Sequence, residues 1–388
     1  MKKIYFDHNA TTPLDEEVLA EMLPYLKDEW GNPSSIHWAS RKPRQGLDTA
    51  REQVAAFLNC APLEIIFTST GTESDNLAIK GIAYGKRKKG NHIITTKVEH
   101  PAVMNTCKYL EKEGFEVTYL GVNEKGMIDL GELEESITDQ TILITVMYAN
   151  NETGVIFPIE DIAKIAKDKG VTFHTDAVQA AGKVALDMKK LDVDLLSISG
   201  HKLYGPKGTG ALFARRGVRL VPLIHGGHHE RNRRGGTENV AGLVGLGKAC
   251  EIAARDMKKE VPYLKNLRDR LEKGFMEKIP DIKINGDIEK RLPNTANISF
   301  EYVEGESLLL NLDMLGIAAS SGSACTSGSL EPSHVLLAMS LSHEMSHGSV
   351  RFSLGKCNTV EEIDFLIEKM PPIVERMRSM SPLYAGTK

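Results

Sequence analysis

The chain has 388 residues, which is long enough for two domains and a large buried core. Hydrophobic residues make up 41% of it and charged residues 26%, an ordinary balance for a globular protein. The net charge of −4 lacks the strong basic excess of a dedicated nucleic-acid binder, so we expect no nucleic-acid partner.

The first two thirds of the chain alternate between helix and strand patterns. Amphipathic spacing predicts helices over residues 15–30, 44–58 and 73–86. Short apolar segments predict seven strands, at residues 65–68, 92–95, 117–120, 142–146, 171–174, 195–198 and 210–214. Strands that alternate with helices indicate a mainly parallel sheet with helices on both faces. We therefore expect an α/β fold whose large domain, residues 15–255, holds a seven-stranded, mainly parallel sheet.

The pattern changes after Gly236. A helical stretch over residues 240–278 contains Pro262, which should kink or divide it. Short strands and helices follow, and a last helix is predicted from Val360 to about Met377. We expect a smaller α/β domain built from residues 1–14 and 256–388, with the N-terminal residues packed near the junction.

Neither a membrane span nor a secretory signal is expected. No apolar run is long enough to cross a bilayer, and only a few apolar residues follow Lys2 and Lys3 before Asp7. The five cysteines are far apart and form no C-x-x-C pair, which argues against a disulfide framework or a structural zinc site. The sequence therefore predicts a cytoplasmic protein without a membrane partner.

Polar residues follow several predicted strands, and ligands of open α/β sheets bind at the carboxyl ends of strands. Lys202 follows one strand and is suited to form a Schiff base with pyridoxal phosphate (PLP). Asp176 follows another and could pair with a protonated pyridine nitrogen, while Gln179 one turn later could bind the ring hydroxyl. The alternatives are a surface lysine and a helix N-cap.

Two further strand ends extend this pattern. Gly71 and Thr72 begin a predicted helix, where free backbone N–H groups could bind a phosphate. His100 follows the next strand and could stack on a planar cofactor and move protons. Plain N-capping and a structural histidine are the alternatives. Each signal is weak alone, but together with the acid 26 residues before Lys202 they predict a PLP site.

Two residues of the second half carry possible substrate chemistry. Cys325 lies in a run of small residues, SSGSACTSG at 320–328, whereas structural cysteines usually have apolar neighbours. A thiol on such a loop (residues 320–329) could act as a nucleophile and then withdraw. Arg351, in the strand-like SVRFS at 349–353, could bind a substrate carboxylate with its fork of donors or form a surface ion pair.

Two histidine clusters resemble metal sites. The HEMSH segment at 343–347 fits the H-E-x-x-H zinc-protease pattern, but Gly348 follows at once and leaves too short and broken a segment for the helix that motif needs. His225, His228 and His229 lie in a glycine-rich loop. We expect no metal site at either position, and a zinc hydrolase remains the alternative from another class.

The chain resembles the NifS/IscS-type cysteine desulfurases over nearly its whole length. The matching motifs are DHNATTP at 7–13, GNPSS at 31–35, TGTES at 70–74, EHP at 99–101, NNETG at 150–154, HTDAVQ at 174–179, SGHK at 199–202, RGGTEN at 234–239 and SGSACTSG at 321–328. The cysteine segment is like that of the long-loop branch, and the residues after it look closest to the nitrogen-fixation-type enzymes. His229 departs from the family, which often has glutamine there.

This resemblance implies a homodimeric enzyme of PLP fold type I that converts L-cysteine to alanine. The sulfur would form a persulfide on Cys325 and pass to an iron–sulfur scaffold protein or another acceptor. A different PLP enzyme, such as an aminotransferase or a selenocysteine lyase, is the nearest alternative. Transamination, however, has no use for a thiol on a loop.

The resemblance also assigns roles to individual residues. The catalytic residues would be Lys202, which binds PLP, Cys325 and His100, which stacks on the ring. Asp176 would meet the pyridine nitrogen and Gln179 the ring hydroxyl. The phosphate would be held by Gly71, Thr72, Ser199 and His201, with Thr237 from the partner subunit. Asn151 and Arg351 would face the substrate carboxylate, with Asn151 also beside the cofactor, and Cys325 could transiently bind a cluster iron.

Overall fold

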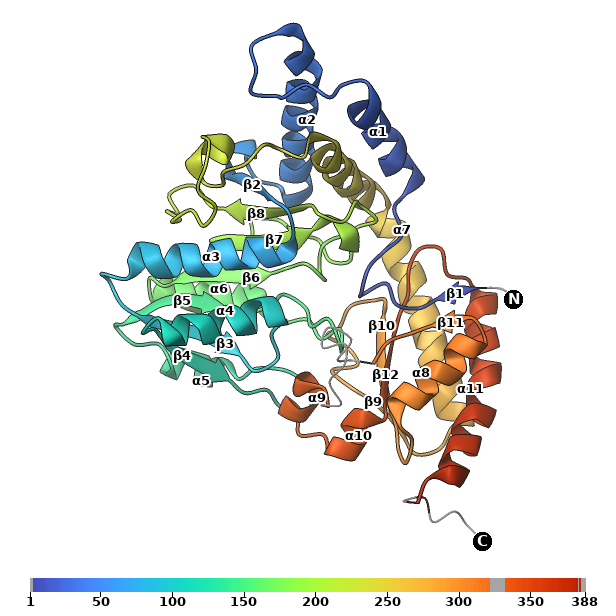
Figure 1. Cartoon of the computed structure of the whole chain (residues 1–388). Coiled ribbons are helices and arrows are strands. Elements are labelled where there is room, and N and C mark those ends of the chain that lie inside the picture. Colours follow the sequence, from blue (N-terminus) through green and yellow to red (C-terminus); the bar gives the residue numbers. More distant parts are fainter. Residues whose placement is uncertain (1–2, 322–331, 383, 385–388) are drawn as a thin grey trace.

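The structure is a computed structural model, and it describes residues 3–321, 332–382 and 384. Cys325 lies outside these residues. Figure 1 shows a layered body around one large sheet and a second, smaller body toward the C-terminus, with helix α7 running between them. In the described part of the chain, no helix is long and apolar enough to cross a membrane.

The large sheet has seven strands, as predicted, in the order β2-β8-β7-β6-β5-β3-β4. The strands are β2 (Ile65–Thr68), β3 (His92–Thr96), β4 (Glu116–Leu120), β5 (Thr141–Thr145), β6 (Thr172–Asp176), β7 (Leu195–Ser199) and β8 (Gly210–Ala214). Only β8 runs antiparallel to its neighbours, β2 and β7, while the other pairs are parallel. The predicted fold class, α/β with a mainly parallel sheet, is confirmed.

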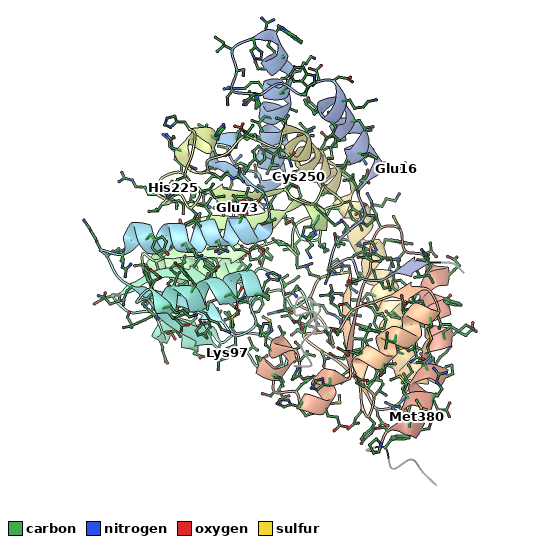
Figure 2. All side chains as sticks on the ribbon, in the orientation of Figure 1. Glu16, Glu73, Lys97, His225, Cys250 and Met380 are labelled. Atoms are coloured by element: carbon green, nitrogen blue, oxygen red, sulfur yellow. The ribbon has the colours of Figure 1, made fainter. Side chains whose placement is uncertain are left out.

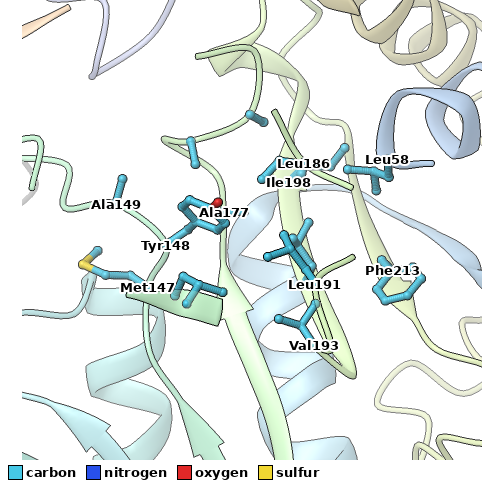
Figure 3. Packing of buried hydrophobic residues seen from close by; sticks show 14 of the residues in the cluster. Leu58, Met147, Tyr148, Ala149, Ala177, Leu186, Leu191, Val193, Ile198 and Phe213 are labelled. Atoms are coloured by element: carbon cyan, nitrogen blue, oxygen red, sulfur yellow. The ribbon is translucent and has the colours of Figure 1, made fainter. Parts of the chain in front are cut away.

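Helices cover both faces of this sheet because successive strand residues point to opposite faces. In β2, Ile65 and Phe67 belong to one hydrophobic cluster and Ile66 to another. The helices are α1 (Glu16–Lys27), α2 (Arg41–Leu58), α3 (Gly71–Lys86), α4 (Pro101–Lys112), α5 (Leu130–Glu135) and α6 (Ile159–Asp168). Helices α3 and α4 pack on the Ile66 side, and α2, α6 and the first part of α7 pack on the other. Figure 3 shows part of the cluster that contains Ile65 and Phe67, with Leu58, Leu186 and Phe213 among its members.

The second body contains an antiparallel sheet of order β12-β10-β9. Its elements are β9 (Ile282–Ile284), β10 (Thr295–Phe300), α8 (Gly305–Met314), β11 (Ile317–Ala318), α9 (His334–Ala338), α10 (His343–His347), β12 (Ser349–Ser353) and α11 (Val360–Met380). Phe275, Phe300 and Phe352 meet in its core. The N-terminal strand β1 (Ile4–Tyr5) pairs with β11, so the chain start is part of this body.

Helix α7 spans Val240–Lys278 and is not divided at Pro262, so of the two expected effects of this proline, a kink or a division, the division does not occur. Proline removes one backbone donor and crowds the preceding turn. The helix persists because its two halves are buried in different cores, with Ile252 in the large-sheet cluster and Leu264 in the smaller one. Helix α7 thus passes through the boundary expected between residues 255 and 256, and that boundary stays a prediction.

Candidate active site

Lys202 lies at the carboxyl end of β7, in the short 3₁₀ turn η3 (Gly200–Lys202). Its Nζ donates to the backbone carbonyls of Asn9 and Ala10, at 2.8 Å for Ala10. The Asn9 carbonyl also accepts a hydrogen bond from Gln179 Nε2 at 2.9 Å. The N-terminal segment therefore packs against the strand ends of the large sheet, as expected, and joins two of the predicted site residues.

Asp176 is the last residue of β6 and is 6% exposed. Its Oδ1 accepts a hydrogen bond from Val178 N at 2.9 Å. Burial raises the pKa of this carboxyl to about 6, although the Val178 N–H and the positive charge of Lys202 act in the opposite direction. A buried carboxyl close to an amine is suited to hold a cationic ring nitrogen, so the N-cap alternative does not describe Asp176 fully.

The predicted phosphate site is a tight cradle at the start of α3. A Cβ on Gly71 would lie 2.8 Å from Val178 Cγ2 and 3.4 Å from Ser199 Cβ, so only glycine leaves space there. Ser199 Oγ and Gln179 Oε1 are buried without a hydrogen-bond partner among the described residues. Buried polar atoms are normally paired, so these two atoms, of which Ser199 Oγ lies beside the Gly71 cradle, fit a phosphorylated, hydroxylated ring such as PLP.

The remaining phosphate candidates differ in their surroundings. His201 Nδ1 lies 3.2 Å from Thr11 Oγ1, and burial with the nearby Lys202 charge lowers the pKa of His201 to about 4. Thr72 is exposed on the first turn of α3, and Thr237 is exposed on the loop before α7. The proposed binding of the phosphate by these two threonines stays a prediction.

His100 is the N-cap of α4, and its Nδ1 accepts a hydrogen bond from Ala102 N at 3.1 Å. The proton of the neutral ring must therefore be on Nε2. Burial, followed by the charge of Lys202, lowers the pKa of His100 to about 4. The ring is neutral at physiological pH and carries its proton on Nε2, which suits a group that stacks on a cofactor and moves a proton.

Arg351 lies on β12, as predicted, and is 2% exposed. Its Nη1 donates to the Asn151 carbonyl at 3.0 Å, its Nη2 donates to Asp7 Oδ1 at 2.8 Å, and its Nε has no partner among the described residues. The alternative of a surface ion pair does not describe Arg351, because its side chain is buried, although that of Asp7 is partly exposed. Asn151 uses its backbone carbonyl here, so its side chain is not committed to Arg351.

Three nearby residues were given no role from the sequence. The carbonyl of Asn9 accepts hydrogen bonds from both Lys202 and Gln179. Asn9 belongs to the recognised motif DHNATTP, but the motif alone gave it no role. Glu99 is fully buried, and its Oε1 accepts hydrogen bonds from Thr96 Oγ1 and Met147 N while Oε2 has no partner in the described part. Burial raises the pKa of Glu99 to about 8 and also raises that of Asp75. These three residues could have been found from the sequence because each is a polar residue within an otherwise buried segment.

The two histidine clusters have ordinary contacts. The 343–347 segment does form a helix, α10, but Ser342 begins it and Gly348 ends it after five residues. His228 Nδ1 lies 2.5 Å from Asn232 Oδ1, and His229 Nε2 lies 3.9 Å from Glu238 Oε2. Across residues 3–321, 332–382 and 384, no three His, Cys, Asp or Glu side chains are grouped to hold a metal ion.

The loop that carries Thr237 is tied to the cradle helix. Arg234 Nε donates to Glu73 Oε1 at 3.0 Å, and Glu73 Oε2 accepts from Ser69 N at 2.9 Å. Figure 2 shows Glu73 and His225 on the same side of the large body, with this loop beside α3. The position of Thr237 therefore depends on contacts next to Gly71.

Known proteins similar to this chain include cysteine desulfurases and NifS-like proteins. A cysteine desulfurase from Nostoc sp. is 57% identical over 382 residues, which cover 98% of this chain and 95% of the relative. The solved structure of a NifS-like protein matches with a TM-score of 0.91 at 40% identity, covering 97% of this chain and all of the other. SspA in complex with cysteine matches with a TM-score of 0.80 at 39% identity, over 91% of this chain and 99% of that one. The model of the class-V aminotransferase family matches residues 4–366, and the chain therefore belongs to that family.

Proposed function

We propose that this chain is a PLP-dependent cysteine desulfurase that takes sulfur from L-cysteine onto Cys325 and releases L-alanine. The observation that carries the proposal is the backbone pairing of Arg351 with Ser320. It brings the start of the Cys325 segment beside the arginine suited to a substrate carboxylate, close to the strand ends that carry Lys202 and Asp176. A substrate held there would have the cofactor site and the thiol segment within reach.

Each residue proposed to bind PLP would contact a different part of the cofactor. When bound, PLP supplies an electron sink for the α-carbon of the substrate. Lys202 would hold the cofactor and then carry the α-proton, and Asp176 would keep the ring nitrogen protonated. Gln179 and His100 would contact the ring. The phosphate would be held by Gly71, Thr72, Ser199, His201 and the partner's Thr237.

The sulfur atoms that take part in the sulfur step belong to the thiol of this chain and to the substrate. The Cys325 thiolate attacks the substrate sulfur, so that an S–S bond forms while the bond between substrate sulfur and carbon breaks. The electron pair of that bond stays on carbon, which takes up a proton to become the methyl group of alanine. Cysteine and the enzyme thiol thus give alanine and a persulfide, with no external oxidant or reductant.

We infer that two copies of the chain form the working enzyme. Trp30, Ile36 and Trp38 are 72%, 103% and 75% exposed on the corner formed by α1 and α2, which projects from the large body in Figure 1. Contiguous large apolar side chains at a surface mark an interface. The exposed Thr237 would then reach the phosphate site of the second copy.

The acceptor of the persulfide sulfur is proposed as an iron–sulfur scaffold protein or another thiol acceptor. This proposal is supported by the resemblance to NifS/IscS-type enzymes. A thiol carrier also requires a reducing compartment such as the cytoplasm. The widely separated cysteines, of which Cys60, Cys107, Cys250 and Cys357 are free, are in keeping with that.

Replacement of Cys325 tests the function. Wild-type protein treated with cysteine and no acceptor should gain the mass of one sulfur atom on the Cys325 peptide. Cys325→Ala should bind the cofactor and show cysteine-dependent absorbance changes, yet form almost no alanine. Cys357→Ala removes an exposed cysteine and should leave the rate unchanged. Wild-type desulfuration by Cys325→Ala would instead favour a lyase that expels sulfur directly, and a keto acid product would favour an aminotransferase.

A further inference from the structure

Both ends of the segment that carries Cys325 are hydrogen-bonded to the candidate active site. On the N-terminal side, Arg351 N donates to the Ser320 carbonyl at 2.7 Å and Ser320 N donates back at 3.3 Å. On the C-terminal side, Ser333 Oγ donates to Glu152 Oε2 at 2.5 Å, and both residues are 3% exposed. The first end is thus held by the proposed substrate-binding arginine, and the second by the residue after Asn151.

Glu152 is a fixed point of the large body. It follows β5 in the NNETG turn, where Asn150 Oδ1 accepts hydrogen bonds from Glu152 N and Thr153 N, both at 2.9 Å. The Glu152 carbonyl accepts a hydrogen bond from Asn297 Nδ2 at 3.2 Å. Since its backbone is held from two sides, the carboxyl group can act as a stable anchor.

Ser333 is equally well defined. It is the N-cap of α9, and its Oγ accepts a hydrogen bond from Leu336 N at 3.2 Å, which leaves its own proton for Glu152. The next residue adds a second tie, because His334 Nε2 lies 3.0 Å from the Glu99 carbonyl. The start of α9, which follows the Cys325 segment in the chain, is therefore bonded to the large body through both Ser333 and His334.

We propose that Glu152 is a positioning residue for sulfur transfer, which acts through Ser333 to limit where Cys325 can reach. This inference rests on the proposed role of Cys325. Cys325 is five residues after Ser320 and eight before Ser333. Loss of the Glu152–Ser333 hydrogen bond removes one of the contacts that fix the described residues on either side of the Cys325 segment.

The test is the single-turnover rate at which Cys325 gains sulfur in the full holoenzyme, followed by mass spectrometry. Ser333→Ala and Glu152→Ala should each slow this step by about tenfold, because small misplacements of reacting groups are costly. Cysteine affinity, from cofactor absorbance, should change by less than about twofold, which separates lost positioning from a changed charge near Arg351. Ser333→Thr and Glu152→Gln keep a donor and an acceptor and should recover most of the lost rate.

Ser342 provides a matched control. It caps the neighbouring five-residue helix α10 through a 3.2 Å bond from Met345 N, as Ser333 caps α9, but among the described residues it has no side-chain bond to the large body. Ser342→Ala should change the rate by less than about twofold, since exposed substitutions usually have small effects. The double variant Ser333→Ala/Glu152→Ala should be no slower than either single variant, because both remove one contact.

Three outcomes would contradict the inference. A wild-type rate in Ser333→Ala would show that the anchor does not position the thiol. Multiplicative loss in the double variant would show that the two residues act separately. If Ser333→Ala does not fold, equal rates in Glu152→Ala and Glu152→Gln would also show that the Glu152–Ser333 contact does not position the thiol. A wild-type enzyme that never gains sulfur on Cys325 would instead refute the proposed function, and that measurement comes first.

Discussion

Arg351 and Asp7 form a buried ion pair in which Nη2 lies 2.8 Å from Oδ1, with side-chain exposures of 3% and 18%. The guanidinium proposed for the substrate carboxylate therefore already faces a protein carboxylate. A buried charge without a partner is costly, so Asp7 stabilises the guanidinium of Arg351 and holds it in one orientation. The Nε donor, which has no partner in the described part of the chain, is left for an incoming carboxylate.

Arg351→Lys should weaken cysteine binding by roughly tenfold to 100-fold, since a charge-assisted hydrogen bond contributes about 1.5–3 kcal/mol and lysine lacks the planar fork. The absorbance of the bound cofactor should not change. Titration with cysteine at fixed pH measures the effect. Arg378→Lys is a suitable control, because Arg378 is also buried in the smaller body but donates only to the Glu301 and Asp281 carbonyls. Equal affinity in wild type and Arg351→Lys would remove Arg351 from the substrate site.

Lys202 should carry the cofactor covalently. Its amine lies at the end of β7. Asp176, a buried acid at the end of the adjacent strand β6, is close enough for the positive charge of Lys202 to lower its pKa. Borohydride reduction followed by peptide mapping should place the pyridoxyl group on the Lys202 peptide. Lys183 lines a cavity together with Lys202, so it serves as the internal control. A label on Lys183 would show that the wrong amine had been assigned.

The sequence predicted the sheet and the location of Asp176 and Lys202 at strand ends because both depend on local patterns. Each strand of the large sheet was found within two residues of its observed ends, since buried parallel strands are short apolar runs. Asp176 and Lys202 were found because polar residues at strand ends stand out against such runs. The segment 240–278 was also recognised as helical, although Pro262 does not divide it.

Other parts of the site depend on contacts between distant segments, which no local pattern contains. Asn9 and Lys202 are bonded across 193 residues, and Ser333 and Glu152 across 181. The raised pKa of Glu99 comes from burial in the assembled fold, which the motif EHP does not reveal. Motif resemblance marked these segments, whereas the contacts give them individual roles.

Mixed dimers should reveal whether the site is shared between subunits. If Thr237 acts on the partner's phosphate site, Lys202→Ala and Thr237→Ala chains combined in one dimer give one doubly defective site and one intact site. Activity should therefore rise to about half that of wild type per mixed dimer, because intact sites act independently in this scheme. Tagged heterodimers isolated by two affinity steps provide the sample. Heterodimers no more active than their parents would place Thr237 in its own subunit's site.

Glu99 should make the cofactor-free chain less stable as the pH rises. Its pKa is raised from 4.5 to about 8 because burial penalises the charged form. Between these values the folded state keeps a proton that the unfolded state releases, so stability is fully present below about 4.5 and is lost as the pH rises through about 8. Glu99→Gln cannot ionise but keeps an oxygen for Thr96 and Met147. Its free energy of unfolding should therefore fall less steeply over this window, by at most about 1.4 kcal/mol per pH unit relative to wild type.

Urea unfolding of the cofactor-free protein at several pH values measures this difference. Asp75 and Asp176 also have raised pKa values, so the comparison of wild type with Glu99→Gln isolates the contribution of Glu99. The exposed Glu375 on α11 gives the control variant Glu375→Gln, whose stability should run parallel to that of wild type. Parallel curves for Glu99→Gln and wild type across the window would mean that Glu99 is ionised in the folded chain. A charged carboxylate would then need a partner for Oε2, the oxygen that has none among the residues placed here.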